Sequence, residues 1–457
     1  MKKVYLATEF AEKGIVTEDL QALIDRCAGE GGGQVRFEAG TYLTATLELR
    51  SGVELYLDAG AVIRGVDDCL MYHNHYWEVS GETAPGSVAS DRWYDALICA
   101  YNQHDIAILG EGVIDGADCF NPTGEQEFRG PHAVLFYQCE GIEFRGFSIV
   151  RSANYAIQLL GCRDIHAAEV KIYGGQDAMR ITDCRNALVE NCDFRTGDDC
   201  VSGQRNENLS FINCRFNTPG GNMFLMSCIH LRMRGCKFWG QGVYPAVFKE
   251  KKRYSNGHAA ICTLHAYPDS DVLASDDWLI EDIEIENIEC VLRHDASSYY
   301  LDCNFGRIVI DGIRVVNHTQ PIMIKGREND SFDLTIRNGV FIRRPDQSDD
   351  GASFLVGERF KKLTLENLTL KGCEGDSVLA LSNGGDVAIR DVNIASPLRD
   401  GQIGAANIGG LSLGNTPEKT TLSPYVVDQI DSIYVPNEKD ETFRGAKPYV
   451  GWQELSK

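Results

Sequence analysis

Residues 184–216 read CRNALVENCDFRTGDDCVSGQRNENLSFINCRF, and this stretch contains one phrase twice. Asn-Cys-Asp-Phe at 191–194 returns as Asn-Cys-Arg-Phe at 213–216, and the pattern continues on both sides. One series of equivalent positions runs through Cys139, Cys162, Cys184, Asn206 and Cys228, and a second runs through Cys192, Cys214 and Cys236. The steps are 22 or 23 residues throughout. A fixed period of this length is typical of a solenoid, in which each coil stacks on the previous one.

Each repeat contains two or three short strands with alternating apolar residues, such as Leu209–Phe211 and Leu231–Met233, separated by Gly, Asn or Asp turns. Less regular repeats follow at Trp278–Ile288, Arg307–Val316, Asp333–Ile342, Lys362–Leu370 and Asp386–Ile394. No helical pattern lies between the strands, which excludes a βαβ fold. The sequence therefore predicts an all-β parallel β-helix, with equivalent residues about 4.8 Å apart. The cysteines, as small apolar residues, are expected to form inward-facing stacks.

The ends of the chain depart from the repeat, and we expect a single domain over residues 1–457. Residues 1–30 are predicted to form an N-terminal cap, with an amphipathic helix that has Thr17 as its N-cap residue and ends near Gly29. The coils are expected over about 31–422, and a non-repetitive tail over about 423–457.

Composition limits the partners. The 44 basic and 66 acidic residues give a formal charge of −22, which argues against nucleic acid and against anionic membrane surfaces. The 16 cysteines include no Cys-x-x-Cys pair and no zinc-ligand spacing, so we expect no metal site and no cofactor. Glu9, Glu12 and Lys13 interrupt the first apolar stretch, so no signal peptide is recognised and a cytoplasmic location is expected. No sequence signature indicates an oligomeric state.

Three aspartates form the candidate catalytic cluster. Asp177 precedes Asp198 by 21 residues and Asp199 by 22, so the period brings the carboxylates of two adjacent coils together on one face. Carboxylates held this close cannot all ionise freely, and one is expected to keep a proton at neutral pH. A protonated acid beside ionised carboxylates is the combination that glycosidic hydrolysis requires. Two other interpretations stay open: turn aspartates that bond local backbone amides, and a calcium site.

Beyond this cluster, the chain resembles the family 28 glycoside hydrolases, the polygalacturonase family of right-handed parallel β-helices. The resemblance covers residues from about 15 to 320 and is carried by Gly31–Phe37, Gly40–Tyr42, Leu47–Leu55, Gly110–Gly116 and the intact Gly197-Asp198-Asp199 motif. It implies that Asp198 is the general acid. It further implies that Asp177 and Asp199 hold and deprotonate the attacking water, with inversion at the anomeric carbon.

The other family motifs are altered, which affects the expected substrate contacts. Gly175-Gln176-Asp177 keeps only the carboxylate of its motif, and Pro219-Gly220-Gly221-Asn222 replaces the motif histidine. Val247-Phe248-Lys249 loses the motif arginine but keeps the lysine. The candidate substrate-binding residues are therefore Lys249, Asn222, Gln176, Arg180, Arg253 and Tyr299. Lys249 and Arg253 belong to the densest basic run, at 249–253, which could equally be a solvated loop. Trp93, Tyr94, Tyr244 and Tyr300 are further candidates for sugar-stacking platforms.

The leading function hypothesis is a hydrolase acting on pectin-type or related oligosaccharides. The first alternative keeps the β-helix but assigns it a lyase, epimerase or intramolecular glycosyl transferase reaction. The second is a non-catalytic carbohydrate-binding β-helix whose catalytic set has decayed with the lost histidine.

Overall fold

A computed structural model of the protein describes residues 2–73, 92–248, 251–253, 258–263, 273–295, 304–319, 321–327, 332–343, 353–371, 378–394, 403–406 and 410–414. The chain divides into two compact units. The first comprises Met1–Pro219 with Val243–Arg253, and the second comprises Gly220–Gly242 with Tyr254–Lys457. Both consist mainly of short strands that pair in parallel, as the sequence predicts for a β-helix.

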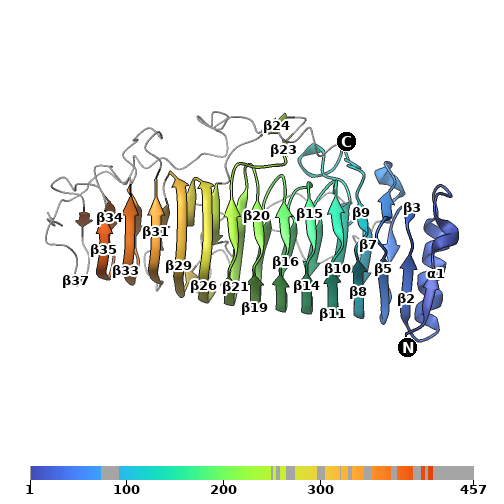
Figure 1. The fold of residues 1–457 in the computed structure, drawn as a ribbon, viewed down its shortest axis with the longest axis horizontal. Coiled ribbons are helices and arrows are strands. Elements are labelled where there is room, and N and C mark those ends of the chain that lie inside the picture. Colours follow the sequence, from blue (N-terminus) through green and yellow to red (C-terminus); the bar gives the residue numbers. More distant parts are fainter. Residues whose placement is uncertain are drawn as a thin grey trace. The chain divides into compact units, whose positions relative to one another are not determined.

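In the first unit, strands of successive coils lie side by side (Figure 1). The strand pairings show that each complete coil contributes one strand to each of three parallel ladders. The first ladder contains β1 (Val4–Leu6), β2 (Gly33–Phe37), β5 (Val53–Leu57), β8 (His104–Gly110), β11 (Glu140–Arg145), β14 (Arg163–Ala168), β17 (Arg185–Glu190) and the second half of β19 (Val201–Ile212). The second contains β3 (Gly40–Thr44), β6 (Ala61–Gly65), β9 (Val113–Asp115), β12 (Ser148–Val150), β15 (Lys171–Tyr173), β18 (Asp193–Arg195) and β20 (Arg215–Asn217). The third contains β4 (Leu47–Glu48), β7 (Ala96–Tyr101), β10 (His132–Tyr137), β13 (Ile157–Leu160), β16 (Met179–Thr182) and the start of β19.

The strand register confirms the period. Arg163 pairs with Arg185 at a step of 22 residues, and Val134 pairs with Ile157 at a step of 23. The cysteine series faces inward, and the Cys162 N–H donates to the Cys184 Sγ at 3.3 Å. Asn206 continues the series, since its side-chain oxygen accepts a 3.0 Å hydrogen bond from the Cys184 N–H. Fourteen of the 16 cysteines are described, and all 14 are free thiols.

The cap helix is present as α1 (Thr17–Gly29), which packs against β2, β4 and β5 through buried Leu20, Ile24 and Cys27. The predicted N-cap residue is wrong, because Val16 precedes the helix and Thr17 is its first residue. The Thr17 hydroxyl instead accepts a 2.8 Å hydrogen bond from the Ala45 N–H, so it joins the helix to the adjacent coil. No helix among the described residues has the length and apolar character needed to cross a membrane.

The strands of the second unit also pair in parallel, and several of them have ten residues or more. This unit contains β21 (Asn222–Arg234), β22 (Lys237–Trp239), β25 (Ala259–Thr263), β26 (Leu273–Ile288), β27 (Cys290–Asp295), β28 (Asn304–Phe305), β29 (Arg307–His318), β30 (Ile322–Lys325), β31 (Asp333–Ile342), β32 (Leu355–Glu358), β33 (Lys362–Lys371), β34 (Leu379–Ser382), β35 (Asp386–Ile394), β36 (Ile403–Ala406) and β37 (Gly410–Gly414). The five later repeats predicted from sequence are confirmed as β26, β29, β31, β33 and β35. The predicted tail, 423–457, lies outside the described residues.

Candidate active site

The three aspartates lie in the turns that lead into the third ladder of the first unit. Asp177 lies two residues before β16, and Asp199 lies two residues before β19, to which β16 is paired. The backbone links the two turns, because the Asp198 N–H donates to the Gln176 carbonyl at 3.3 Å and the Ala178 N–H donates to the Asp199 carbonyl at 3.1 Å. The backbone turn that leads into Asp177 requires a glycine at position 175, where φ is +80°. A Cβ added to Gly175 would lie 3.2 Å from the Asn154 carbonyl oxygen.

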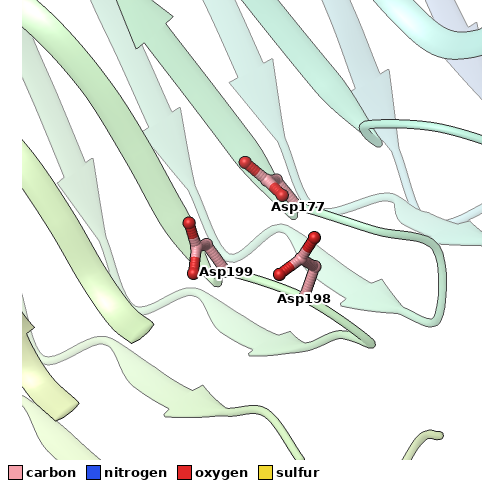
Figure 2. A group of neighbouring side chains, drawn as sticks. All are labelled: Asp177, Asp198 and Asp199. Atoms are coloured by element: carbon pink, nitrogen blue, oxygen red, sulfur yellow. The ribbon is translucent and has the colours of Figure 1, made fainter. Parts of the chain in front are cut away.

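The three carboxylates gather in one place, as Figure 2 shows. One oxygen from each of Asp177, Asp198 and Asp199 can be chosen so that all three lie within 4.8 Å of one another. The juxtaposition that the 21- and 22-residue spacing predicts is therefore present. The oxygens are closer than the separation of about 6.5–9.5 Å between the carboxyl groups of inverting glycosidases.

Asp177 is the most enclosed member of the cluster, with only 3% of its surface exposed. Burial and, to a smaller extent, the neighbouring Asp198 carboxylate raise its pKa to about 7, against the opposing effects of Arg180, Arg129 and the hydrogen bond from Ser202. The hydroxyl of buried Ser202 donates a hydrogen bond to the Asp177 Oδ2. Asp177 is therefore placed to hold a proton near neutral pH.

Asp198 has a different environment, because a buried guanidinium contacts it. Arg129 is 6% exposed, and its Nη2 lies 3.2 Å from the Asp198 Oδ2. The Asp198 side chain is 25% exposed, so it also reaches solvent. A hydrogen bond between charged groups of this kind is stronger than one between neutral groups.

Arg129 reaches the cluster from an insertion between β9 and β10 that includes the short 3-10 helix η3 (Glu125–Glu127). Its Nη1 donates to the Asn154 Oδ1 at 3.3 Å, and its Nε lies 3.5 Å from a Glu125 carboxylate oxygen. The Asn154 amide also donates to the Gly130 carbonyl at 3.1 Å, which fastens the insertion to the next coil. The guanidinium lies 5.2 Å from the centre of the Tyr155 ring. Arg129 is thus held from several sides.

Arg180 is a second cation next to the cluster, and unlike Arg129 it is partly exposed. Its guanidinium carbon lies 5.6 Å from the centre of the Tyr155 ring, and its Nη1 donates to the Ser202 hydroxyl at 3.2 Å. Within the part of the chain that the structure describes, no carboxylate forms an ion pair with Arg180. A partly exposed guanidinium of this kind can bind a carboxylate of a ligand.

Sequence reasoning missed Arg129, Tyr155 and Ser202. The period could have found Tyr155, because it lies 22 residues before Asp177 and 44 before Asp199. Strand pairing extends this column back to His132, whose ring is 5.4 Å from that of Tyr155. Burial lowers the pKa of His132 to about 3, so this imidazole stays neutral and serves packing. Arg129 has no such signal, because it lies in an insertion 69 residues before Asp198.

The other predicted binding residues have different outcomes. Gln176 is buried, and its carbonyl supports Asp198. Asn222 begins β21 in the second unit. Lys249 and Tyr299 lie outside the described residues, as does Tyr300, so their roles stay predictions.

Arg253 ends β24 (Lys251–Arg253), which pairs antiparallel with β23 (Ala246–Phe248). Residues 251–253 of the basic run therefore form a strand rather than an irregular loop. Trp93 and Tyr94 are buried in a core cluster and cannot be exposed platforms. Tyr244 is partly exposed and stacks on Tyr173, with ring centres 6.4 Å apart.

The arrangement provides one carboxyl group suited to hold a proton, one arginine-paired carboxylate in the adjacent turn, and a third carboxylate directly after it in the same turn. Such a set can donate a proton to a leaving oxygen and accept one from water. A hard cation could also use oxygens at this spacing, but it would compete with Arg129 for the charge of Asp198.

Comparison with known proteins supports the fold and relates it to carbohydrate-cleaving enzymes. Residues 132–246 match the family model described as "Right handed beta helix region". A probable polygalacturonase from Vitis vinifera is 25% identical over 199 residues, which cover 40% of this chain and 39% of that protein. The matches cover less than half the length of each of the curated relatives.

Solved structures confirm the right-handed parallel β-helix. An exopolygalacturonase from Thermotoga maritima matches with a TM-score of 0.62 and 16% identity, covering 81% of this chain and 92% of that one. The surface adhesin PfbA of Streptococcus pneumoniae matches with a TM-score of 0.55 and 13% identity, covering 91% of this chain and 93% of that one. At these identities the structural matches establish the fold alone.

Proposed function

We propose that this right-handed β-helix protein, a polygalacturonase-like chain by sequence, is a glycoside hydrolase acting on pectin-type or related oligosaccharides. The observation that carries the proposal is the cluster of Asp177, Asp198 and Asp199, whose oxygens come within 4.8 Å of one another beside two arginines. Turn aspartates with only a structural role need neither the burial of Asp177 nor a buried counter-ion. The similarity to polygalacturonases supports the reaction class.

In the proposed reaction, one carboxyl group gives its proton to the glycosidic oxygen as the bond from that oxygen to the anomeric carbon breaks. Water attacks the anomeric carbon, and an ionised carboxylate of the cluster takes the proton that the water loses. The family resemblance implies inversion, with two carboxylates on the water. Proton NMR of the first product anomer tests this point: we expect inversion, and retention would contradict it.

Arg180 supports an acidic sugar as substrate. The protein carries a formal charge of −22, which would repel a polyanion unless the site supplied local positive charge. Arg180 and Arg129 supply that charge next to the cluster, and Arg180 is the partly exposed one. We therefore propose that Arg180 contacts a substrate carboxylate, a role that family members give to an arginine absent here.

The test is incubation with a panel of pectic and other oligosaccharides, with products identified by mass spectrometry. We expect cleavage by the wild type and by Asp164→Asn, which changes an exposed aspartate in β14 of the same unit, and none by Asp198→Asn. An unsaturated product that absorbs ultraviolet light would instead indicate a lyase. Binding without turnover across the panel would indicate a carbohydrate-binding β-helix.

A further inference from the structure

Arg180 differs from the other arginines around the acid cluster in what neutralises its charge. Arg129 pairs with Asp198, and Arg205, further along β19, pairs with Asp183. Arg180 is partly exposed, and no carboxylate among the described residues lies within ion-pair distance of it. Its charge is therefore available to a ligand, and its neighbours decide where that charge points.

The first neighbour of the Arg180 guanidinium is the ring of Tyr155. The guanidinium carbon lies 5.6 Å from the centre of this ring. The ring is itself enclosed, because buried Trp93 meets it edge to face at 5.6 Å and the buried His132 ring lies 5.4 Å away. Arginine stacks on aromatic faces, and an immobile ring restricts the orientations that the guanidinium can adopt.

The second neighbour is Ser202, which is the Cα partner of Arg180 across the ladder and is fully buried. The Arg180 Nη1 donates to the serine hydroxyl at 3.2 Å, and this hydroxyl donates to the Asp177 Oδ2. A guanidinium has only donors, so the hydroxyl accepts from Arg180 and has its single O–H left for Asp177. The hydrogen-bond chain therefore has one direction, and it fixes the arginine relative to the carboxyl group of Asp177.

The part of the guanidinium that remains is a planar set of N–H donors. Among the described residues, Ser202 is the one hydrogen-bond partner of the Arg180 side chain. Planar N–H donors of this kind match the two oxygens of a carboxylate, and such charged hydrogen bonds are stronger than neutral ones. The geometry therefore suits a substrate carboxylate held at a fixed place beside Asp177.

We propose that Tyr155 and Ser202 are positioning residues that hold Arg180 as a carboxylate-selective subsite, so that the protein cleaves next to a uronic acid residue. This inference rests on the proposed hydrolase function. Tyr155 acts through its ring and Ser202 through its hydroxyl, and neither needs to touch the substrate. The free carboxylate of the sugar then decides which oligosaccharides are cleaved, and neutralising it removes the preference.

The selectivity is the ratio of kcat/KM for an oligogalacturonate to kcat/KM for its methyl ester. We expect a ratio of about 10 to 100 in the wild type, because the ester cannot form charged hydrogen bonds with Arg180. Arg180→Met should bring the ratio close to 1. Arg205→Met, at a partly exposed arginine already paired with Asp183, is the matched control and should keep the wild-type ratio. A wild type without preference, or an Arg180→Met protein that keeps it, would overturn the proposal.

The same ratio tests the two positioning residues. Tyr155→Leu should lower it by about 3- to 10-fold, whereas Tyr155→Phe keeps an aromatic face and should keep most of it. Ser202→Ala should lower both the ratio and kcat, since Asp177 also loses a hydrogen bond. A purely structural role would reduce the amount of active protein but leave the ratio unchanged, because both substrates meet the same folded molecules.

An unchanged ratio in Ser202→Ala or in a folded Tyr155→Leu protein would therefore refute the positioning role of that residue. Ser202→Ala removes a single buried oxygen, so it tests the geometry even where Tyr155→Leu does not fold.

Calorimetric binding separates this inference from the proposed function. Asp198→Asn, which should not cleave, is titrated with the oligogalacturonate and with its methyl ester. We expect the acid to bind about 10-fold more tightly than the ester, and this difference to disappear when Arg180→Met is added. If the wild type cleaves nothing, the hydrolase proposal fails, but the same titration of the wild type still tests the subsite. Cleavage of acid and ester at equal rates would refute the subsite and leave the hydrolase in place.

Discussion

Two columns of residues in the first unit follow the same 22-residue period but differ in chemistry. The amide ladder, Asp164, Asn186 and Asn208, is exposed, and each asparagine amide donates to the preceding member, at 2.9 and 3.2 Å. The acid column, Tyr155, Asp177 and Asp199, instead places carboxylates in successive coils beside Arg129 and Arg180. Its member Asp177 is 3% exposed and has a pKa raised by burial.

The two columns separate a structural role of Asp and Asn residues from a functional one. In the amide ladder all three residues lie within strands and have φ between 55° and 58°, a left-handed conformation that Asn and Asp tolerate. Asp164, Asn186 and Asn208 also line a shallow hollow of about 540 Å³, so a depression in the surface does not by itself identify the site. Only the acid column combines a carboxyl group of raised pKa with a buried counter-ion, which has no role in making a turn.

The largest expected effect is on activity. Asp177→Asn should lower oligosaccharide cleavage by about 100- to 10,000-fold, because general acid–base groups contribute that much. Asp164→Asn makes the same chemical change in the amide ladder and should alter the rate less than twofold. Initial rates on one oligosaccharide measure both. Similar losses in the two variants would remove the distinction between the columns.

The next effect concerns the buried ion pair. Arg129→Met removes the partner of Asp198 and should lower the free energy of unfolding by about 3–5 kcal/mol at neutral pH. Arg205→Met is the control, because Arg205 pairs with Asp183 at a site where both side chains are partly exposed, 24% and 31%. We expect about 0–1 kcal/mol there. Urea unfolding followed by circular dichroism compares them, and equal losses would argue against a special role for Arg129.

The raised pKa of Asp177 also predicts a pH-dependent stability. An unfolded aspartate has a pKa of about 3.9, whereas burial raises that of folded Asp177 to about 7. The wild type should therefore lose stability from this group as pH rises from about 4 to 7, by about 4 kcal/mol at most.

Asp177→Asn removes the titrating group, so its melting temperature relative to wild type should rise between pH 4 and pH 8. Thermal unfolding at several pH values measures this difference, with Asp164→Asn scanned in parallel. A relative melting temperature that falls over this interval would show that folding favours the ionised Asp177.

The smallest effect belongs to the amide ladder. Asn186→Ala loses the hydrogen bond to Asp164 and places alanine at a φ of +58°, which should cost about 1–2 kcal/mol. Activity should stay within twofold of wild type. Asn186→Gly, which accepts the positive φ, should recover part of the lost stability in the same melting experiment. A large activity loss in either variant would link the ladder to the site.

The period explains how much of this could be predicted from sequence. It placed Asp177 beside Asp199 and identified Asn206 as the member that replaces a cysteine, because both depend on steps of about 22 residues. It could not find Arg129, whose insertion belongs to no repeat and whose contact with Asp198 spans 69 residues. The sequence also predicts exposed sugar-stacking platforms at Trp93 and Tyr94. This prediction is wrong, because a position outside the strands does not reveal whether a side chain is buried. Thr17 looked like a helix cap, but its hydroxyl is used by the neighbouring coil.

In the proposed hydrolase, the acid column together with Asp198 adds water across a glycosidic bond. An oligosaccharide that the wild type cleaves is digested in water enriched in oxygen-18, and the products are analysed at once by mass spectrometry. This measurement tests the addition of water most directly. We expect one heavy oxygen at the new reducing end with the wild type, and no product with Asp198→Asn. Unsaturated fragments without heavy oxygen, or labelled products formed equally by Asp198→Asn, would contradict the account.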